Sequence, residues 1–297
     1  MIELASDREV ARAATADEEG DSQFFGMFEG LRRLALPQTS IIQPYEGFHA
    51  RVYDALTSRN VWDAYVYLRE LTRKPTTVLE LACGAGRLTL PLLRTGCDVY
   101  AIDLSTDLLA GLRDRTRQEG VRCPHLIAAD IRDFALKRRF DVILLGGLTI
   151  SLLPRETDRE RVFRQVAQHL TDDGTFFLDI ITAPMQALIA RSGGTLVFPL
   201  RGRSGRGFTI VGWMVVARRR IQVVNMYSEW VNGGGQVARF LSSLTTHLIS
   251  LRALRDELQR AGLRITATIP VRHHVGDQLV DDGVSILRCV RTGDRSR

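Results

Sequence analysis

The sequence VLELACGAG at residues 78–86 decides the fold of this chain. An apolar run leads into a turn of small residues, and a helical pattern follows at residues 87–95. A turn of this kind needs glycine because the backbone bends sharply and a ligand approaches it closely. Glu80 lies near the carboxyl end of the predicted strand, where open α/β sheets bind their ligands. The segment therefore predicts a strand, a ligand-binding turn and a helix in succession.

Strand and helix patterns alternate beyond this segment. The next predicted strands lie at residues 98–102, 125–129, 140–145 and 175–181. The predicted helices between them lie at residues 106–119 and 158–170, with Gly174 as the stop of the second. This alternation predicts an α/β fold in which a parallel sheet carries helices on both faces. The nearly continuous apolar strands agree with burial of both sheet faces.

Acidic residues close three successive predicted strands. Asp103 follows Glu80 by 23 residues, and Asp130 ends the next strand along the chain. A carboxylate at the place of Asp103 can accept hydrogen bonds from both ribose hydroxyls of an adenosine group, and one at Asp130 from the adenine amine. A lone G-x-G turn or a lone acid has simpler explanations, namely a tight turn or a helix N-cap. Three acids beside a glycine turn predict an adenosine-containing cofactor.

Four segments of the sequence resemble the motifs of the class I S-adenosylmethionine-dependent methyltransferases. They are ELACGAG, VYAIDLS, LIAADIRDF and FDVILLGGLTISLL, and the resemblance extends over about residues 61–291. It implies a Rossmann-like seven-stranded sheet whose last strand is antiparallel, and S-adenosyl-L-methionine as the cofactor. The residues that it assigns to cofactor binding are Glu80, Ala82, Gly84, Gly86, Asp103, Leu104, Asp130, Ile131, Leu145 and Gly146. A dinucleotide dehydrogenase, the main alternative, usually has a third glycine where this chain has Thr89.

The alternation breaks after Pro184. Four predicted strands follow at residues 195–200, 208–216, 220–231 and 236–246, separated by turns rich in glycine and arginine. They predict an antiparallel β-meander inserted into the α/β fold, which serves as a lid or as the contact of a homodimer. A helix at residues 251–261 and a pair of strands at 263–269 and 284–290 are expected to close the fold. The predicted domains are an acidic arm with helices at 1–45, the cofactor-binding core at 46–183, the meander at 184–249 and the closing segment at 250–297.

Motifs that are missing from the sequence exclude several classes of methyl acceptor. Residues 146–149 read GGLT, which lacks the Asn/Asp-Pro-Pro-aromatic motif of base-methylating DNA enzymes, and the paired glutamates of protein arginine methyltransferases are missing. The meander and the Tyr53-Asp54 pair resemble those of N-methyltransferases that act on glycine and on amino sugars. An amine of a small molecule or peptide is therefore the expected acceptor, with Tyr53 and His247 as candidate catalytic residues. A finer hypothesis is the tailoring of a ribosomally made peptide of daptide type.

Composition and charge narrow the remaining function classes. The formal charge is +6, but Lys74 and Lys137 are the only lysines among 40 basic residues. Such an arginine skew is typical of GC-rich codon usage, so we expect no nucleic-acid partner. No apolar run approaches the ~20 residues of a membrane helix, and the acidic first 30 residues differ from a secretory signal, which favours a cytoplasmic protein.

Several alternatives stay open at this point. The four cysteines contain no C-x-x-C pair, and no Asp/Asn cluster marks the predicted strand ends, so no metal is expected. An O-methyltransferase of a small molecule would use the same cofactor-binding motifs. So would an RNA methyltransferase, which the basic charge suggests, and a regulator that binds the methyl donor without turnover.

Overall fold

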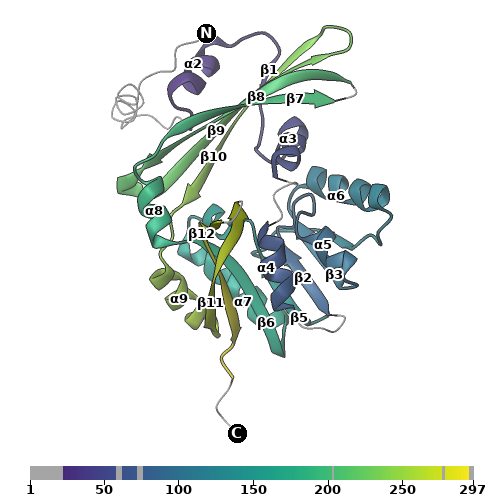
Figure 1. Cartoon of the computed structure of the whole chain (residues 1–297), viewed down its shortest axis with the longest axis vertical. Helices are drawn as coiled ribbons and strands as arrows, with labels where there is room; N and C mark the ends of the chain where they lie inside the picture. Colours follow the sequence, from purple (N-terminus) through teal and green to yellow (C-terminus); the bar gives the residue numbers. More distant parts are fainter. Residues whose placement is uncertain (1–22, 58–61, 72–75, 203, 276–277, 294–297) are drawn as a thin grey trace. The chain divides into compact units, whose positions relative to one another are not determined.

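The structure is a computed structural model that describes residues 23–57, 62–71, 76–202, 204–275 and 278–293. It divides into two compact units, whose elements Figure 1 labels. One unit combines Met1–Val52 with Ala187–Thr246, and the other combines Tyr53–Gln186 with His247–Arg297. The acidic arm falls largely on residues 1–22, which lie outside the described residues. Within the described ranges, no helix is both long and apolar enough to cross a membrane.

A seven-stranded sheet is the centre of the unit that contains the glycine turn. Its strand order is β11-β12-β6-β5-β2-β3-β4. The strands are β2 (Thr77–Leu81), β3 (Asp98–Asp103), β4 (His125–Ala128), β5 (Phe140–Leu145), β6 (Leu170–Ile181), β11 (Leu263–Val275) and β12 (Gln278–Arg291). The first five run parallel where they pair, whereas β12 is antiparallel to both β6 and β11. The predicted sheet, with its last strand antiparallel, is confirmed.

Helices pack on both faces of this sheet. They are α4 (Trp62–Glu70), α5 (Thr89–Arg94), α6 (Thr106–Glu119), α7 (Glu156–His169) and α9 (Leu251–Arg260). Phe163 of α7 and Leu258 of α9 are fully buried in one apolar cluster. Tyr67 of α4 and Leu92 of α5 belong to a second cluster against the other face. Each such side chain contributes about 1.5–3 kcal/mol by leaving water, and together they fix the strand ends that carry the site.

The second unit is built on a five-stranded sheet with the order β1-β10-β9-β8-β7. Its strands are β1 (Thr39–Ile41), β7 (Gly194–Gly202), β8 (Gly205–Val216), β9 (Ile221–Asn232) and β10 (Val237–His247). Helix α2 (Gly26–Leu34) inserts Phe28 beside Tyr227 and Leu241. The predicted four-stranded meander is confirmed, with β1 as an additional strand that pairs in parallel with β10. Its role as a lid or as a dimer contact stays a prediction.

The structure differs from the sequence-based boundaries in several places. Strands β11 and β12 form a longer pair than the predicted strands at 263–269 and 284–290, since Val275 pairs with Gln278. Helix α3 (Gly47–Thr57) and the short helix α8 (Ala183–Ile189) were not predicted, because glycine or proline near their starts indicates turns. Helix α7 ends at His169, so Gly174 does not stop a helix but lies inside β6. Pairing of Leu170 with Phe140 of β5 extends the strand backward past the polar residues that precede Gly174.

We expect Gly86→Ala to lower the free energy of unfolding by about 2–4 kcal/mol. Gly86 has φ +90°, and an added Cβ would lie 2.3 Å from Cδ1 of the buried Leu112. Both the left-handed conformation and the overpacked contact are costly for alanine. Denaturant unfolding measures the change. The matched control is Gly111→Ala in α6, because the added Cβ would lie at an ordinary contact distance of 3.8 Å from Cβ of Ala85. Equal losses of unfolding free energy in the two variants would contradict the prediction.

Candidate active site

The turn between β2 and α5 adopts a backbone that few residues tolerate. Ala82, Gly84 and Gly86 all have positive φ, at 54°, 56° and 90°. The left-handed region costs a residue with a Cβ about 1–2 kcal/mol, so Ala82 carries strain where the resembling family often has glycine. The Cys83 amide donates to the Ile102 carbonyl of β3 at 2.9 Å, which anchors the turn to the neighbouring strand.

Asp103, the last residue of β3, holds the same turn through its carboxylate. Oδ2 accepts from the Gly84 amide at 2.8 Å, and Oδ1 accepts from the Ser105 amide at 2.8 Å. Burial raises the pKa of this carboxyl group, and the backbone donors oppose the rise. Each carboxylate oxygen has two acceptor sites, so Asp103 can hold the turn and still accept from a ribose hydroxyl.

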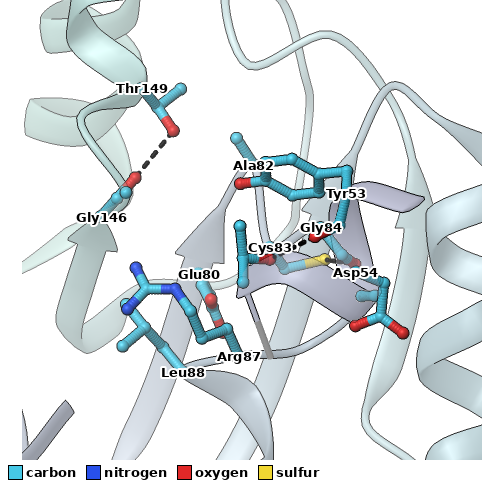
Figure 2. Close-up of a pocket in the computed structure, with 13 residues that line it drawn as sticks. Tyr53, Asp54, Glu80, Ala82, Cys83, Gly84, Arg87, Leu88, Gly146 and Thr149 are labelled. Carbon is cyan, nitrogen blue, oxygen red and sulfur yellow. Dashed lines mark hydrogen bonds between the residues drawn. The ribbon is translucent and has the colours of Figure 1, made fainter. Parts of the chain in front are cut away.

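A hollow opens beside the turn (Figure 2). Its lining residues come from α3, from the carboxyl end of β2 with the turn after it, and from the segment that follows β5. They are Tyr53, Asp54, Thr57, Glu80, Ala82, Cys83, Gly84, Ala85, Arg87, Leu88, Gly146, Gly147 and Thr149.

Glu80 is the buried acid of the hollow. Only 3% of the residue is exposed, and Thr89 Oγ1 donates to its Oε2 at 2.6 Å. Burial raises the pKa of Glu80 to about 7, because a charged carboxylate loses its hydration there. A cationic group of a ligand, such as an ammonium, would favour the ionised form and be held by it.

A second buried acid, Asp179 of β6, fixes the segment after β5. It accepts from the Gly147 amide at 2.9 Å and from the Leu148 amide at 2.8 Å. Burial raises the pKa of Asp179 to about 6. Leu148 has φ +57°, a conformation that these two hydrogen bonds help to maintain. Asp179 is not among the predicted site residues, although a charged residue within the apolar run FFLDII is the signal that marks it.

Tyr53 contributes an aromatic ring to the hollow from the second half of α3. A Cβ on Gly84 would lie 3.9 Å from Tyr53 Cε1, so the ring passes directly over the turn. Burial raises the pKa of Tyr53, which keeps the phenol neutral. Arg115 of α6 ties this part of α3 to the turn, because its Nη1 donates to Asp54 Oδ1 at 2.9 Å and to the Ala85 carbonyl at 3.0 Å.

His247 lies in a different hollow from Tyr53. That second hollow is lined mainly by apolar residues, among them Leu148, Ile150 and Ile180, together with Gln186. Burial, followed by the charge of Arg159, lowers the pKa of His247, so the imidazole is neutral near pH 7. Both hollows border the segment after β5, since Gly147 and Thr149 line the first and Leu148 lines the second.

The residues that the resemblance assigns to cofactor binding lie in different environments. Glu80, Ala82, Gly84 and Gly146 line the first hollow, and Gly86 lies in the turn beside it. Leu104 is 72% exposed directly after β3, whereas the side chains of Leu145 and Ile131 are buried in the core.

Asp130 has a cationic partner of its own. Arg132 donates to it from Nε at 3.0 Å and from Nη2 at 2.5 Å, and this hydrogen bonding lowers the pKa of Asp130. The guanidinium therefore competes with an adenine amine for this carboxylate. The cofactor contacts of all the assigned residues, and the catalytic roles of Tyr53 and His247, stay predictions.

These groups fit S-adenosylmethionine. The glycine turn allows close approach of a ligand, Asp103 offers acceptors for ribose hydroxyls, and Glu80 offers a carboxylate for the methionyl ammonium. Residues 78–174 match the family described as "Methyltransferase domain". The chain therefore carries a class I S-adenosylmethionine-dependent methyltransferase domain, and S-adenosyl-L-methionine is its cofactor.

Several of the relatives are N-methyltransferases. The chain is 28% identical over 193 residues to the cypemycin N-terminal methyltransferase of a Streptomyces species, covering 64% of this chain and 73% of that protein. It is 28% identical over 142 residues to dTDP-3-amino-3,6-dideoxy-alpha-D-glucopyranose N,N-dimethyltransferase of Streptomyces fradiae, covering 46% of this chain and about half, 54%, of that enzyme. The glycopeptide N-methyltransferase MtfA, solved with S-adenosylmethionine, aligns with a TM-score of 0.51 and 25% identity over 78% of this chain and 93% of MtfA.

Removing the Asp103 carboxylate should weaken cofactor binding. Asp103→Ala loses charge-assisted contacts on the order of 2–3 kcal/mol, which corresponds to a roughly 30- to 150-fold higher Kd for S-adenosylhomocysteine by calorimetry. Asp103→Asn keeps one acceptor oxygen and should fall between Asp103→Ala and the wild type. Unchanged affinity in a folded Asp103→Ala protein would contradict the assignment.

The raised pKa of Glu80 predicts a pH-dependent loss of stability. The unfolded carboxyl titrates at its usual 4.5 and the folded one at about 7. Between these values the unfolded state releases a proton that the folded state retains, so stability falls as pH rises through this window. The free energy of unfolding of Glu80→Gln, relative to wild type, should therefore increase by on the order of 2–3 kcal/mol from pH 5 to pH 8. A difference that stays constant with pH would contradict the raised pKa.

Proposed function

We propose that this methyltransferase transfers the methyl group to an amine of a small molecule or of a peptide. The observation that supports the proposal is a group of relatives whose names specify N-terminal, amino-sugar and glycopeptide N-methylation, although a ubiquinone biosynthesis O-methyltransferase is also similar to this chain, at 24% identity. The acceptor is an inference for this chain, since the matched identities lie at 25–28%.

The side chains of the hollow suit an amine acceptor. S-adenosylmethionine, when bound, supplies a methyl group that its sulfonium already activates, so orientation provides much of the rate. An amine can react once it is neutral and aligned with the methyl group. Neither condition requires a strong base. The neutral Tyr53 hydroxyl can accept a hydrogen bond from an amine N–H and thereby direct the nitrogen lone pair. The ring of Tyr53 can also stabilise a nearby positive charge.

His247 has a separate part in this proposal. Its pKa is lowered by burial and by Arg159, so the neutral imidazole can accept the proton that the amine releases. Since His247 lines the second hollow, we propose that the acceptor molecule extends past the segment at residues 147–149. The mostly apolar lining of that hollow favours an acceptor with an apolar portion next to its amine.

Two finer points belong to the same proposal. The substrate could be a ribosomally made peptide of daptide type, which a genomic neighbourhood with a precursor peptide would support. The five-stranded sheet would act as a lid or as the contact of a homodimer. Mass measurement in solution distinguishes a dimer from a monomer, and a monomer that keeps full activity would exclude the dimer contact.

Turnover against a panel of amines, alcohols, short peptides and RNA tests the acceptor class. We expect methylation of amines, with a rate that rises with pH toward the pKa of the amine. Tyr53→Phe and His247→Ala should reduce kcat by about 10- to 1,000-fold while changing the Kd for S-adenosylhomocysteine little, because neither is proposed to hold the adenosine.

Each other outcome of the panel identifies an alternative. Methylation confined to hydroxyl groups would identify an O-methyltransferase. Salt-sensitive activity on RNA would identify an RNA methyltransferase. Donor binding without turnover on any acceptor would point to a regulator. Any of the three would overturn the amine proposal.

A further inference from the structure

Leu148 has a backbone conformation that leucine rarely adopts. Its φ is 57° and its ψ is 22°, in the left-handed region that glycine occupies without a steric cost. The described residues contain five non-glycine residues with positive φ, namely Ala35, Gln38, Ala82, Leu148 and Arg220. Leu148 is the one among them with a branched apolar side chain, which makes it the most unusual residue in this conformation.

Hydrogen bonds hold the backbone of Leu148 in place. Its amide donates to Asp179 Oδ1 at 2.8 Å, and the preceding Gly147 amide donates to Oδ2 of the same carboxylate at 2.9 Å. The Leu148 carbonyl accepts from the Ser151 amide at 2.9 Å and from the Ser151 hydroxyl at 2.6 Å. These contacts use the donor and both acceptor positions of the Leu148 backbone. A glycine would make the same contacts without strain, so the backbone does not explain why leucine is present.

Core packing does not explain the leucine either. Leu148 is partly exposed, and it is not a member of any apolar cluster that the described residues form. The neighbouring Ile150, by contrast, is only 2% exposed and belongs to the core of the seven-stranded sheet. Leu148 instead lines the second hollow together with Ile180 and His247. Backbone strain that core packing does not offset is an indication of function.

We infer that Leu148 selects methyl acceptors whose amine carries an apolar chain, because its side chain provides a contact surface for that chain in the second hollow. The inference rests on the proposed function, in which the acceptor extends past the segment at residues 147–149. Contact between Leu148 and an apolar chain removes both surfaces from water, which is favourable. An ether or hydroxyl oxygen at the same place would lose hydration without gaining a hydrogen bond from the leucine side chain. Leu148 thus distinguishes apolar from polar acceptors.

Two amines of similar length test this specificity. Hexylamine has a chain of carbon atoms alone, whereas 2-(2-aminoethoxy)ethanol carries an ether and a hydroxyl oxygen. Their affinities for the protein saturated with S-adenosylhomocysteine are measured by ligand-observed NMR titration, and their kcat/KM values by methyl transfer. Wild type should prefer hexylamine in both measurements. Leu148→Asn keeps the size of the side chain and suits the left-handed conformation, and it should reduce the preference about 5- to 20-fold.

Thermal unfolding separates a role in specificity from a role in structure. Leu148→Gly removes the strain of the left-handed conformation, so its midpoint of unfolding should rise while its preference for hexylamine falls. The matched control is Ala35→Gly, because Ala35 has φ 44° at the end of α2. Its midpoint should also rise, but its preference should equal that of wild type, since Ala35 lines neither hollow.

Two results would overturn the inference. In the first, Leu148→Gly and Leu148→Asn both unfold at a lower temperature than wild type, which means that the leucine is kept for packing. In the second, wild type shows no preference for hexylamine, or both variants retain the wild-type preference. Methylation of amines with that second result would leave the proposed function in place. Preferential binding of hexylamine through Leu148 without methylation of any amine would support the inference and contradict the proposed function.

Discussion

The hydrogen bond between the Asp103 carboxylate and the Gly84 amide is the contact on which the site depends. It joins the end of β3 to the turn that follows β2, and the second oxygen of the same carboxylate accepts from Ser105 at the start of α6. Parallel strands place their carboxyl ends along one edge of the sheet, but they leave the connecting turns free to vary. One carboxylate with two backbone donors removes that freedom and gives the turn a single conformation.

Buried charge is the second constraint on this site. Glu80 and Asp179 are nearly inaccessible to water, and burial raises the pKa of both. A buried carboxylate without a partner destabilises a fold. Buried carboxylates are therefore expected where they accept hydrogen bonds from backbone amides or bind a ligand. Asp179 stabilises the segment after β5 through two amides, whereas Glu80 accepts from Thr89 and faces the hollow. One acid thus shapes the wall of the site, and the other is placed to meet the ligand.

The second sheet has a core of its own, which explains how a large insertion can follow β6 without disturbing the methyltransferase domain. Phe28 of α2 packs against β8 where Gly212 offers no side chain, since a Cβ there would lie 2.3 Å from the Phe28 ring. The buried His49 donates to or accepts from Ser228 at 3.1 Å, which links α3 to the middle of β9. Segments from the amino terminus and from the insertion therefore form one folding unit, although more than 130 residues separate them in sequence.

The sequence by itself determined the α/β fold, an adenosine-containing cofactor and the position of the glycine turn. These follow from local signals, because apolar strands, glycine turns and acids at strand ends keep their meaning wherever the strands pair. The resemblance of four motifs to class I methyltransferases then specified S-adenosyl-L-methionine. The sequence also indicated the meander, because alternation of side chains is local to each strand. Tertiary structure alone decided that β1 joins β10, that Gly174 lies within β6, and that Tyr53 and His247 line separate hollows. It also selected Asp179, since burial and proximity to Gly147 arise only when distant segments pack together.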